Sequence, residues 1–315
     1  MGSRCPASPH QRRSFVSRLI VAVIPVFRAP SSLVDRVNAL TTQVDAIVLV
    51  DDGTHSLSRL GLESSFVHVI ELDENRGIGY ALNSGVERAR SLGATHVLTL
   101  DQDSAPPAGY VESALDVLAD AETAGVRVAA VVPDLVGDQR VLRRDGFAFD
   151  PIQAGQLIPI DVFADIGLFR DELFIDAVDS EFSIRGEDHG FRFVVAEGQR
   201  IEHALGELVP LTAFGRHITI AGKPRHVLYH APFRTYYMVR NSTILVREFG
   251  SRRRGWMLFR TRKMAEMVVG CVVLSPDRGA QWRATIAGLT DGWRGVTGRI
   301  TEDRLVRIQS GRRKR

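Results

Sequence analysis

Two carboxylates separated by one residue follow a short apolar segment in the middle of the chain. Asp101 and Asp103 come directly after residues 96–100, which are apolar and partly β-branched and are therefore predicted to form a buried strand. Ligands of open α/β sheets bind in the crevice at the carboxyl ends of the strands. Because hard divalent cations take carboxylate oxygens and share them with substrate phosphates, the pair favours a metal site. A solvated acidic turn is the alternative for the pair taken alone.

Four other side chains have types that suit chemistry at such a site. His203 is a candidate third metal ligand, although a histidine taken by itself is more often a packed or surface residue. Asp179 lies at the expected start of a helix, where the helix dipole favours a carboxylate and where the residue also suits a simple N-cap. Arg234 and Arg240 lie on a later predicted helix, and their guanidinium groups suit phosphate contacts.

The elements that must position these residues alternate between strands and helices. Apolar runs predict the strands, and apolar residues at helical spacing predict the helices. Strands are expected at 19–26, 46–50, 66–70, 95–100 and 126–132, and helices at 31–43, 75–92, 108–124 and 179–190. Residues 134–160 are expected to form a β excursion beside the site. The alternation predicts an α/β fold with a mostly parallel twisted sheet that helices flank.

Length and composition fit one large α/β domain with an appendage. The chain has 315 residues, a net charge of +3 and 44% hydrophobic residues, which is ordinary for a soluble protein. Its two cysteines have no disulfide or zinc spacing. Residues 1–17 are expected to be a disordered leader, and 19–27 a strand and not a signal peptide, because Pro25 interrupts the run. No run has the roughly 18–20 apolar residues of a membrane span, so we expect a cytoplasmic protein.

The C-terminal third carries most of the excess positive charge. Residues 247–263 hold seven basic residues and one acid, with Trp256 and Phe259 among them. This composition is typical of a basic amphipathic helix on an anionic membrane surface, and a charged helix packed on the domain is equally compatible with it. We expect a helical region over 246–305 and a basic tail over 306–315. No nucleic-acid-binding signature is present, so nucleic acid is not an expected partner.

Six segments, taken in their order along the chain, resemble those of glycosyltransferase family 2. The resemblance covers about residues 19–250 and is greatest to bacterial rhamnosyltransferases, followed by galactofuranosyltransferases. The blocks around 174–181 and 236–241 are the most specific in combination. The six segments are Val50–Thr54, Asn75–Gly79, Leu100–Asp103, Phe174–Glu181, His203 with Gly206, and Tyr236–Asn241.

This resemblance implies a fold, a reaction and partners. It implies a GT-A domain over 18–245 that inverts the anomeric carbon, uses Mn²⁺ or Mg²⁺, and takes a nucleotide-diphosphate sugar, dTDP-rhamnose above all. The implied acceptor is a glycolipid or polysaccharide of cell-envelope synthesis, which would place the enzyme on the inner face of the cell membrane. Galactofuranosyl or other hexosyl transfer, nucleotidyl transfer, and sugar-nucleotide binding without activity are the alternatives. Nucleotidyl transfer is the weaker reading, because no Gly-rich basic loop follows the first strand.

The resemblance also assigns roles by position. Asp179 aligns with the catalytic base, and many members carry Glu-Asp where this chain has Val178-Asp179, which makes Glu181 a substitute candidate. The implied metal ligands are Asp101, Asp103 and His203. The residues expected to bind the nucleotide sugar are Asp51, Asp52, Asn75, Arg76, Gly77, Asp101, Gln102 and Arg240. Acceptor-side or secondary roles are expected for Glu181, Arg185 and Asn241.

Overall fold

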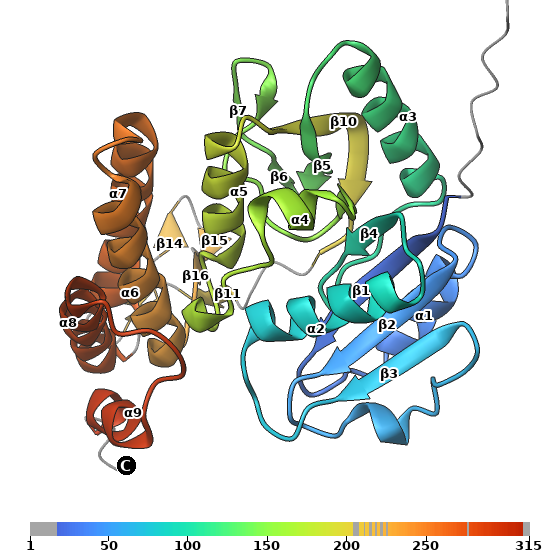
Figure 1. Cartoon of the computed structure of the whole chain (residues 1–315). Coiled ribbons are helices and arrows are strands. Elements are labelled where there is room, and N and C mark those ends of the chain that lie inside the picture. The colour runs from blue at the N-terminus through green and yellow to red at the C-terminus, as the bar shows by residue number, and fades with distance from the viewer. Residues whose placement is uncertain are drawn as a thin grey trace, which may run out of the picture.

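The computed structural model describes most of the chain as a central sheet with helices on both faces and a group of helices beside it (Figure 1). Three parts of the chain that the sequence analysis names lie outside the described residues. They are the expected leader over 1–17, Gly206, which belongs to the resemblance, and the last five residues. The described residues are 18–203, 208–210, 212–213, 216–217, 219–220, 223–224, 226–275 and 277–310.

The central sheet is mostly parallel, as the sequence predicts. Its strands run in the order β10-β5-β9-β4-β1-β2-β3, and only β9 and the short β6 run against their neighbours. All other pairings in the sheet are parallel. The strands are β1 (Ile20–Val26), β2 (Ala46–Asp51), β3 (Val67–Glu71), β4 (His96–Thr99), β5 (Val128–Val136), β6 (Gln139–Arg140), β9 (Gln156–Pro159) and β10 (Arg192–Ile201).

The sheet is buried on both faces because its strands are apolar at successive positions. On β1, Val21 and Val23 face the core that α2, α4 and α5 cover, whereas Ala22 and Ile24 face the core that α1 and α3 cover. The helices are α1 (Leu33–Leu40), α2 (Ile78–Ser91), α3 (Tyr110–Thr123), α4 (Val162–Ile166) and α5 (Val178–Asp188).

Two irregular segments interrupt this alternation. The expected β excursion is confirmed: β7 (Arg143–Arg144) and β8 (Phe147–Ala148) form a small hairpin before the chain returns through β9. A second set of short antiparallel pairs follows β10. These are β11 (Leu208–Pro210) with β16 (His226–Leu228), β12 (Thr212–Ala213) with β13 (Arg216–His217), and β14 (Thr219–Ile220) with β15 (Lys223–Pro224).

The C-terminal region is helical, and α6 is its centre. Helix α6 starts with Pro232 in its first turn, a position that needs no backbone donor. The expected tail boundary at 305 is wrong, because α9 continues past it and buries Ile308 in a cluster with Tyr236 and Tyr237. No helix in the described part of the chain is long and apolar enough to cross a membrane. The helices are α6 (Pro232–Phe249), α7 (Arg254–Val269), α8 (Arg278–Arg294) and α9 (Glu302–Gln309).

Two glycines of α8 allow its backbone to approach α6 closely. A Cβ atom on Gly292 would lie 2.6 Å from the carbonyl oxygen of Arg240, and one on Gly288 would lie 2.7 Å from that of Tyr236. Hydrogen bonds from Tyr236 to Asp291 (2.9 Å) and from Thr235 to Gln281 (2.7 Å) join the same two helices. The C-terminal helices are therefore packed at backbone contact distance.

We predict that Gly292→Ala lowers the free energy of unfolding by about 1–3 kcal/mol, because the added methyl meets backbone that cannot move aside. Gly279→Ala on the same helix is the matched control, since its Cβ would meet only the tip of the Arg283 side chain at 3.4 Å. That variant should be neutral or stabilising by roughly 0.5–1 kcal/mol. Urea unfolding measures both, and equal stabilities would contradict the close packing of α8 on α6.

Candidate active site

Asp101, Asp103 and His203 meet at the carboxyl ends of β4 and β10. An isolated bridge between Ala105 and Glu202, with hydrogen bonds of 2.9 and 3.0 Å, ties the two strand-end loops together. His203 Nδ1 consequently lies 3.4 Å from Asp103 Oδ1 and 3.7 Å from Asp101 Oδ2. The structure thus brings together three residues that the sequence separates by about a hundred positions.

The three side chains fit a divalent cation. Their donor atoms all lie within 4.8 Å of one another, which suits ligands that share one ion at 2.0–2.6 Å. Burial raises the pKa of Asp101 to about 6, His203 opposes this rise, and the negative charge of Asp103 adds to it. A cation would relieve that repulsion between the two carboxylates. Carboxylate donors suit Mg²⁺ and Mn²⁺.

Asp51 and Asp52 build the loop that follows β2. The Asp51 carboxylate is fully buried and accepts hydrogen bonds from the backbone and hydroxyl groups of Thr54 and Ser56. Burial alone would raise its pKa, but these hydrogen bonds lower it on balance. Asp52 accepts from the backbone N–H groups of Arg76 (2.6 Å) and Gly77 (2.9 Å). Asp51 therefore shapes this loop from inside, and Asp52 joins it to the start of α2.

The loop before α2 reaches the same edge of the sheet. Gly77 has φ +91°, and a Cβ there would lie 2.3 Å from the carbonyl oxygen of Phe174. The guanidinium of Arg76 lies 3.7 Å from the centre of the Tyr80 ring. Asn75 accepts a hydrogen bond from the backbone of Gly77 at 3.2 Å. These residues lie where the sequence expects a nucleotide pocket, and their contact with a nucleotide stays a prediction.

Gln102 joins the end of the first strand to this edge of the sheet through two hydrogen bonds. Its Oε1 accepts from the backbone N–H of Phe27 at 2.9 Å, and its Nε2 donates to the carbonyl of the same residue at 3.2 Å. The side chain of Gln102 thus locks the end of β1 beside the Asp-x-Asp loop. Its expected role in donor binding stays a prediction.

Asp179 lies in the first turn of α5, and Ala177, not Asp179, is the N-cap residue. Its carboxylate accepts a hydrogen bond from the backbone of Ser180 at 2.8 Å. Burial raises its pKa to about 6, the negative charge of Asp150 adds to the rise, and Arg260 opposes it. A half-buried carboxylate with a pKa near neutrality suits general-base chemistry.

The backbone before α5 is strained. Phe174, Asp176 and Ala177 all have positive φ, at 67°, 64° and 65°. Such residues persist only where their surroundings hold them. The amide nitrogen of Asn241 donates to the carbonyl oxygens of Leu173, Ile175 and Asp176, each at 2.8 Å. Asn241 therefore positions this loop, which fits a secondary role, and its contact with an acceptor stays a prediction.

The expected phosphate contact of Arg240 is wrong. Its side chain has 0% exposure, and it donates to the carbonyl oxygens of Gly298 (2.6 Å) and Leu173 (2.9 Å). Arg234 is the arginine of this helix that reaches the site. It forms an ion pair with Asp176 at 3.2 Å. Its side chain is 45% exposed, so its guanidinium is accessible to a ligand. The carboxylate of Asp176 raises the pKa of Arg234.

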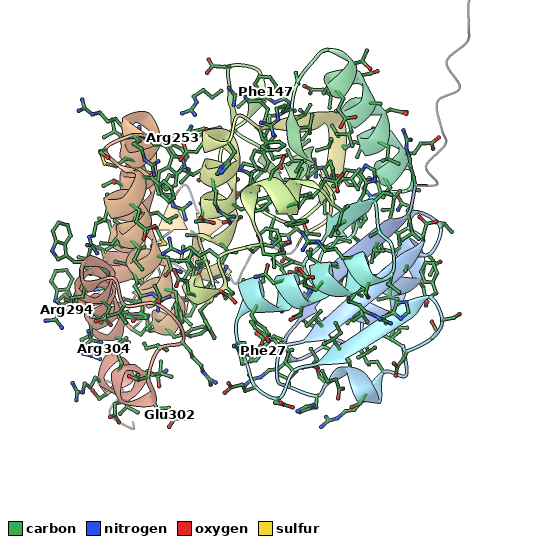
Figure 2. The ribbon with its side chains drawn as sticks, in the orientation of Figure 1. Phe27, Phe147, Arg253, Arg294, Glu302 and Arg304 are labelled. Atoms are coloured by element: carbon green, nitrogen blue, oxygen red, sulfur yellow. The ribbon has the colours of Figure 1, made fainter. Side chains whose placement is uncertain are left out.

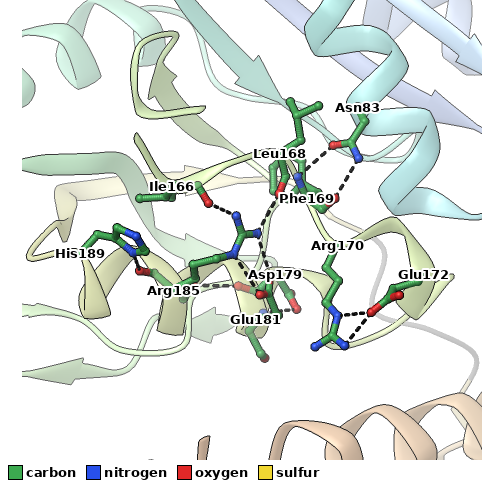
Figure 3. A network of polar contacts seen from close by, with 12 residues as sticks. Asn83, Ile166, Leu168, Phe169, Arg170, Glu172, Asp179, Glu181, Arg185 and His189 are labelled. Carbon is green, nitrogen blue, oxygen red and sulfur yellow. Dashed lines mark hydrogen bonds and ion pairs between the residues drawn. The ribbon is translucent and has the colours of Figure 1, made fainter. Parts of the chain in front are cut away.

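The contacts of Glu181 make it a poorer candidate for the base than Asp179, and its substitute role stays a prediction. Its carboxylate is 4% exposed and accepts hydrogen bonds from Arg185 at 2.9 and 2.8 Å. Figure 3 shows Arg185 in turn donating to the carbonyl oxygens of Ile166 and Leu168. Glu181 and Arg185 thus hold the chain between α4 and α5, and their expected acceptor-side or secondary roles stay predictions.

Three residues that the sequence analysis did not single out complete the surroundings of the site. Gln153, on the β excursion, donates to Asp101, and Asp150 on the same loop forms an ion pair of 3.2 Å with Arg260 of α7. Among the described residues, Asp150 Oδ1 and Gln153 Oε1 are buried without a hydrogen-bond partner. The placement of this excursion beside the site was expected, but nothing in its sequence distinguishes these two side chains.

Comparisons with known proteins agree with this geometry. Residues 21–176 match the family model for glycosyl transferase family 2. The chain is 25% identical over 286 residues to the dTDP-rhamnosyl transferase RfbF of Shigella flexneri, with 83% of this chain and 92% of that protein covered.

Solved structures show the fold. Residues 1–349 of S. aureus TarS superpose with a TM-score of 0.55 at 14% identity, over 87% of this chain and 80% of that one. A second S. aureus TarS structure gives a TM-score of 0.53 at 14% identity, over 93% of this chain and 50% of that one. The fold is therefore the GT-A fold that the resemblance implied.

We predict that Asn241→Ala lowers the free energy of unfolding by about 3 kcal/mol, because the carbonyls of Ile175 and Asp176 lose their donor. Thr243→Ala is the matched control two positions along the same helix, where the hydroxyl only donates back to Val239. It should cost less than about 1 kcal/mol. Thermal and urea unfolding compare the two variants, and equal losses would contradict the positioning role of Asn241.

Proposed function

Because the chain carries a glycosyltransferase family 2 domain and is a glycosyltransferase, we propose that it transfers L-rhamnose from dTDP-rhamnose to a glycolipid or polysaccharide acceptor. The observation that carries the proposal is the meeting of a carboxylate–histidine triad with a second, half-buried carboxylate at one edge of a GT-A sheet. The choice of sugar rests on the similarity to the Shigella flexneri enzyme. The acceptor class rests on the resemblance to rhamnosyltransferases of cell-envelope synthesis.

The donor half of the reaction needs positive charge at the leaving diphosphate. Asp101, Asp103 and His203 would hold a divalent cation, which supplies charge neutralisation for the diphosphate. Arg234 adds a guanidinium, which pairs with the carboxylate of Asp176 and suits contact with a diphosphate. The loops after β2 and before α2 would receive the nucleoside, and the N-terminus of α2 favours its anionic end.

The acceptor half needs one base and no second carboxylate nucleophile. Asp179 would accept the proton of the acceptor hydroxyl as that oxygen attacks the anomeric carbon. Single displacement inverts the anomeric carbon, whereas retaining glycosidases need a second carboxylate to form a covalent intermediate. Val178 in place of a family carboxylate is therefore compatible with catalysis. A pKa raised to about 6 makes the Asp179 carboxylate a stronger base than an ordinary one and still leaves most of it ionised at neutral pH.

We predict that dTDP-rhamnose binds and turns over in preference to UDP-galactofuranose and UDP-glucose, and that both activities require Mn²⁺ or Mg²⁺. Asp103→Ala should abolish metal-dependent donor binding, because it removes one of three ligands. Glu202→Gln is the control, since it removes a neighbouring exposed charge that lies outside the triad. Calorimetry with metal and with donor measures both. Unchanged Mn²⁺ affinity in Asp103→Ala would contradict the metal assignment, and preference for another donor would contradict the sugar.

We predict that kcat/KM falls as the pH drops through about 6, because the base must be deprotonated and its pKa is raised to about 6. Asp179→Asn should lower turnover by about 10²–10⁴-fold and remove this acidic limb. The dissociation constant of the donor should stay nearly unchanged, because the amide keeps the shape of the side chain.

Glu181→Gln serves as the control for this variant. Its loss of the ion pair with Arg185 should lower the melting temperature and leave the pH profile in place. Normal turnover in Asp179→Asn, with a collapse in Glu181→Gln that melting does not explain, would move the base to Glu181.

A further inference from the structure

Helix α8 carries a stripe of large apolar side chains that face solvent. Trp282, Ile286, Leu289 and Trp293 recur at intervals of four, three and four residues, so they lie on one face of the helix. The two tryptophans are 55% and 70% exposed, and the two aliphatic side chains are 47% and 44% exposed. A continuous exposed patch of this kind marks an interaction surface.

The stripe points away from the rest of the molecule. The opposite face of α8 is buried through Gln281, Ala284 and Gly288 and packs on α6. Figure 2 shows Arg294, next to the stripe, on the side of the C-terminal helices away from the central sheet. None of the four side chains can therefore contribute to the core or to the candidate active site.

Arginines border the stripe at both ends. Arg278 lies one turn before Trp282, Arg294 follows Trp293, and the guanidinium of Arg247 lies 5.4 Å from the Trp293 ring. Over residues 278–294, all of which the structure describes, the one carboxylate is Asp291, which is buried and bonded to Arg304. The exposed side of α8 is thus apolar along its middle and positive at its edges.

Two arginines of the basic run that suggested a membrane helix from the sequence pair with carboxylates of the domain. Arg253 forms ion pairs with Glu187 and Asp188, and Arg260 pairs with Asp150. These contacts join α7 to the domain through charges that would otherwise be available to lipid. Helix α7 thus fits the packed-helix alternative better than the membrane one.

We propose that the stripe of α8, and not α7, docks the protein on an anionic membrane surface. Tryptophan is the side chain enriched at the membrane–water interface, and here it stands at both ends of an aliphatic patch. Bordering arginines are attracted to anionic headgroups while the patch enters the acyl boundary. The inference does not depend on which sugar the enzyme transfers.

A second copy of the chain is a poorer occupant of this face. At these exposures the two tryptophans have an accessible surface area on the order of 250 Å². With the two aliphatic side chains added, the stripe is still well below the roughly 800 Å² that each partner of a stable complex buries. Symmetric pairing would also bring the same arginine-bordered surface against itself, and like charges disfavour that contact.

Vesicle flotation with the full chain tests the proposal. The protein should bind vesicles of phosphatidylglycerol and phosphatidylcholine, bind poorly to phosphatidylcholine alone, and dissociate as salt rises. The double variant Trp282→Ser with Trp293→Ser should bind at least about tenfold more weakly, and Arg294→Gln about fivefold more weakly. Leu258→Ser is the matched control, since it removes a 72% exposed apolar side chain from α7. It should bind normally.

Fluorescence gives an independent readout, because the chain has three tryptophans and only Trp256 is buried. Emission should shift to the blue on binding and be quenched by brominated lipid, and a Trp282→Phe, Trp293→Phe protein should lose both signals. Unfolding curves confirm that each variant is folded. Equal vesicle binding by the double serine variant, or no binding to anionic vesicles, overturns the proposal. A dimer in sedimentation equilibrium that the same variant dissociates would assign the face to a second copy.

Discussion

The candidate site depends on one amide group that holds a strained turn. Three residues between 174 and 177 have positive φ without being glycine, and each costs on the order of 1–3 kcal/mol. The turn persists because Asn241 donates to three of its carbonyls, while the backbone N–H of Ile78 donates to Phe174 at 2.8 Å. Because of this turn, Asp176 faces Arg234 and Asp179 lies in the first turn of α5. The strain is therefore the means by which two carboxylates reach one edge of the sheet.

That arrangement makes the C-terminal helices part of the candidate active site. The loops of the sheet and the first turn of α5 supply acids, namely Asp101, Asp103, Asp150, Asp176 and Asp179. The arginines that balance these charges come from outside the sheet: Arg234 from α6 and Arg260 from α7. A domain cut at the end of the sheet would retain the carboxylates without these two partners, and their mutual repulsion would be uncompensated.

Much of the fold and part of the site were predictable from the sequence. What could not be predicted depends on how side chains pack in the folded chain. Apolar runs bounded by turns identify buried strands, and carboxylates after a strand end identify a ligand edge, which is how Asp101 and Asp103 are found. Arg234 and Arg240 have equal chemistry and lie six positions apart on one helix. Only packing decides that Arg240 is buried against Tyr237 and Arg234 is not. The role of Asn241 depends on carbonyls that are free only because the turn is strained, and no local pattern encodes that.

The match to the family model covers only part of the candidate site. It ends at residue 176, before Asp179, His203 and Arg234. The matched part contains the sheet edge, where parallel strands impose a common geometry on their carboxyl ends. The unmatched part has two roles: it holds the strained turn through hydrogen bonds, and it presents positive charge to the carboxylates of the site. Helix α6 does both, with Asn241 and Arg240 buried on one side and Arg234 reaching the site from its first turn. Helix α8 also packs on α6, so its outward stripe is fixed to the same helix that shapes the candidate site.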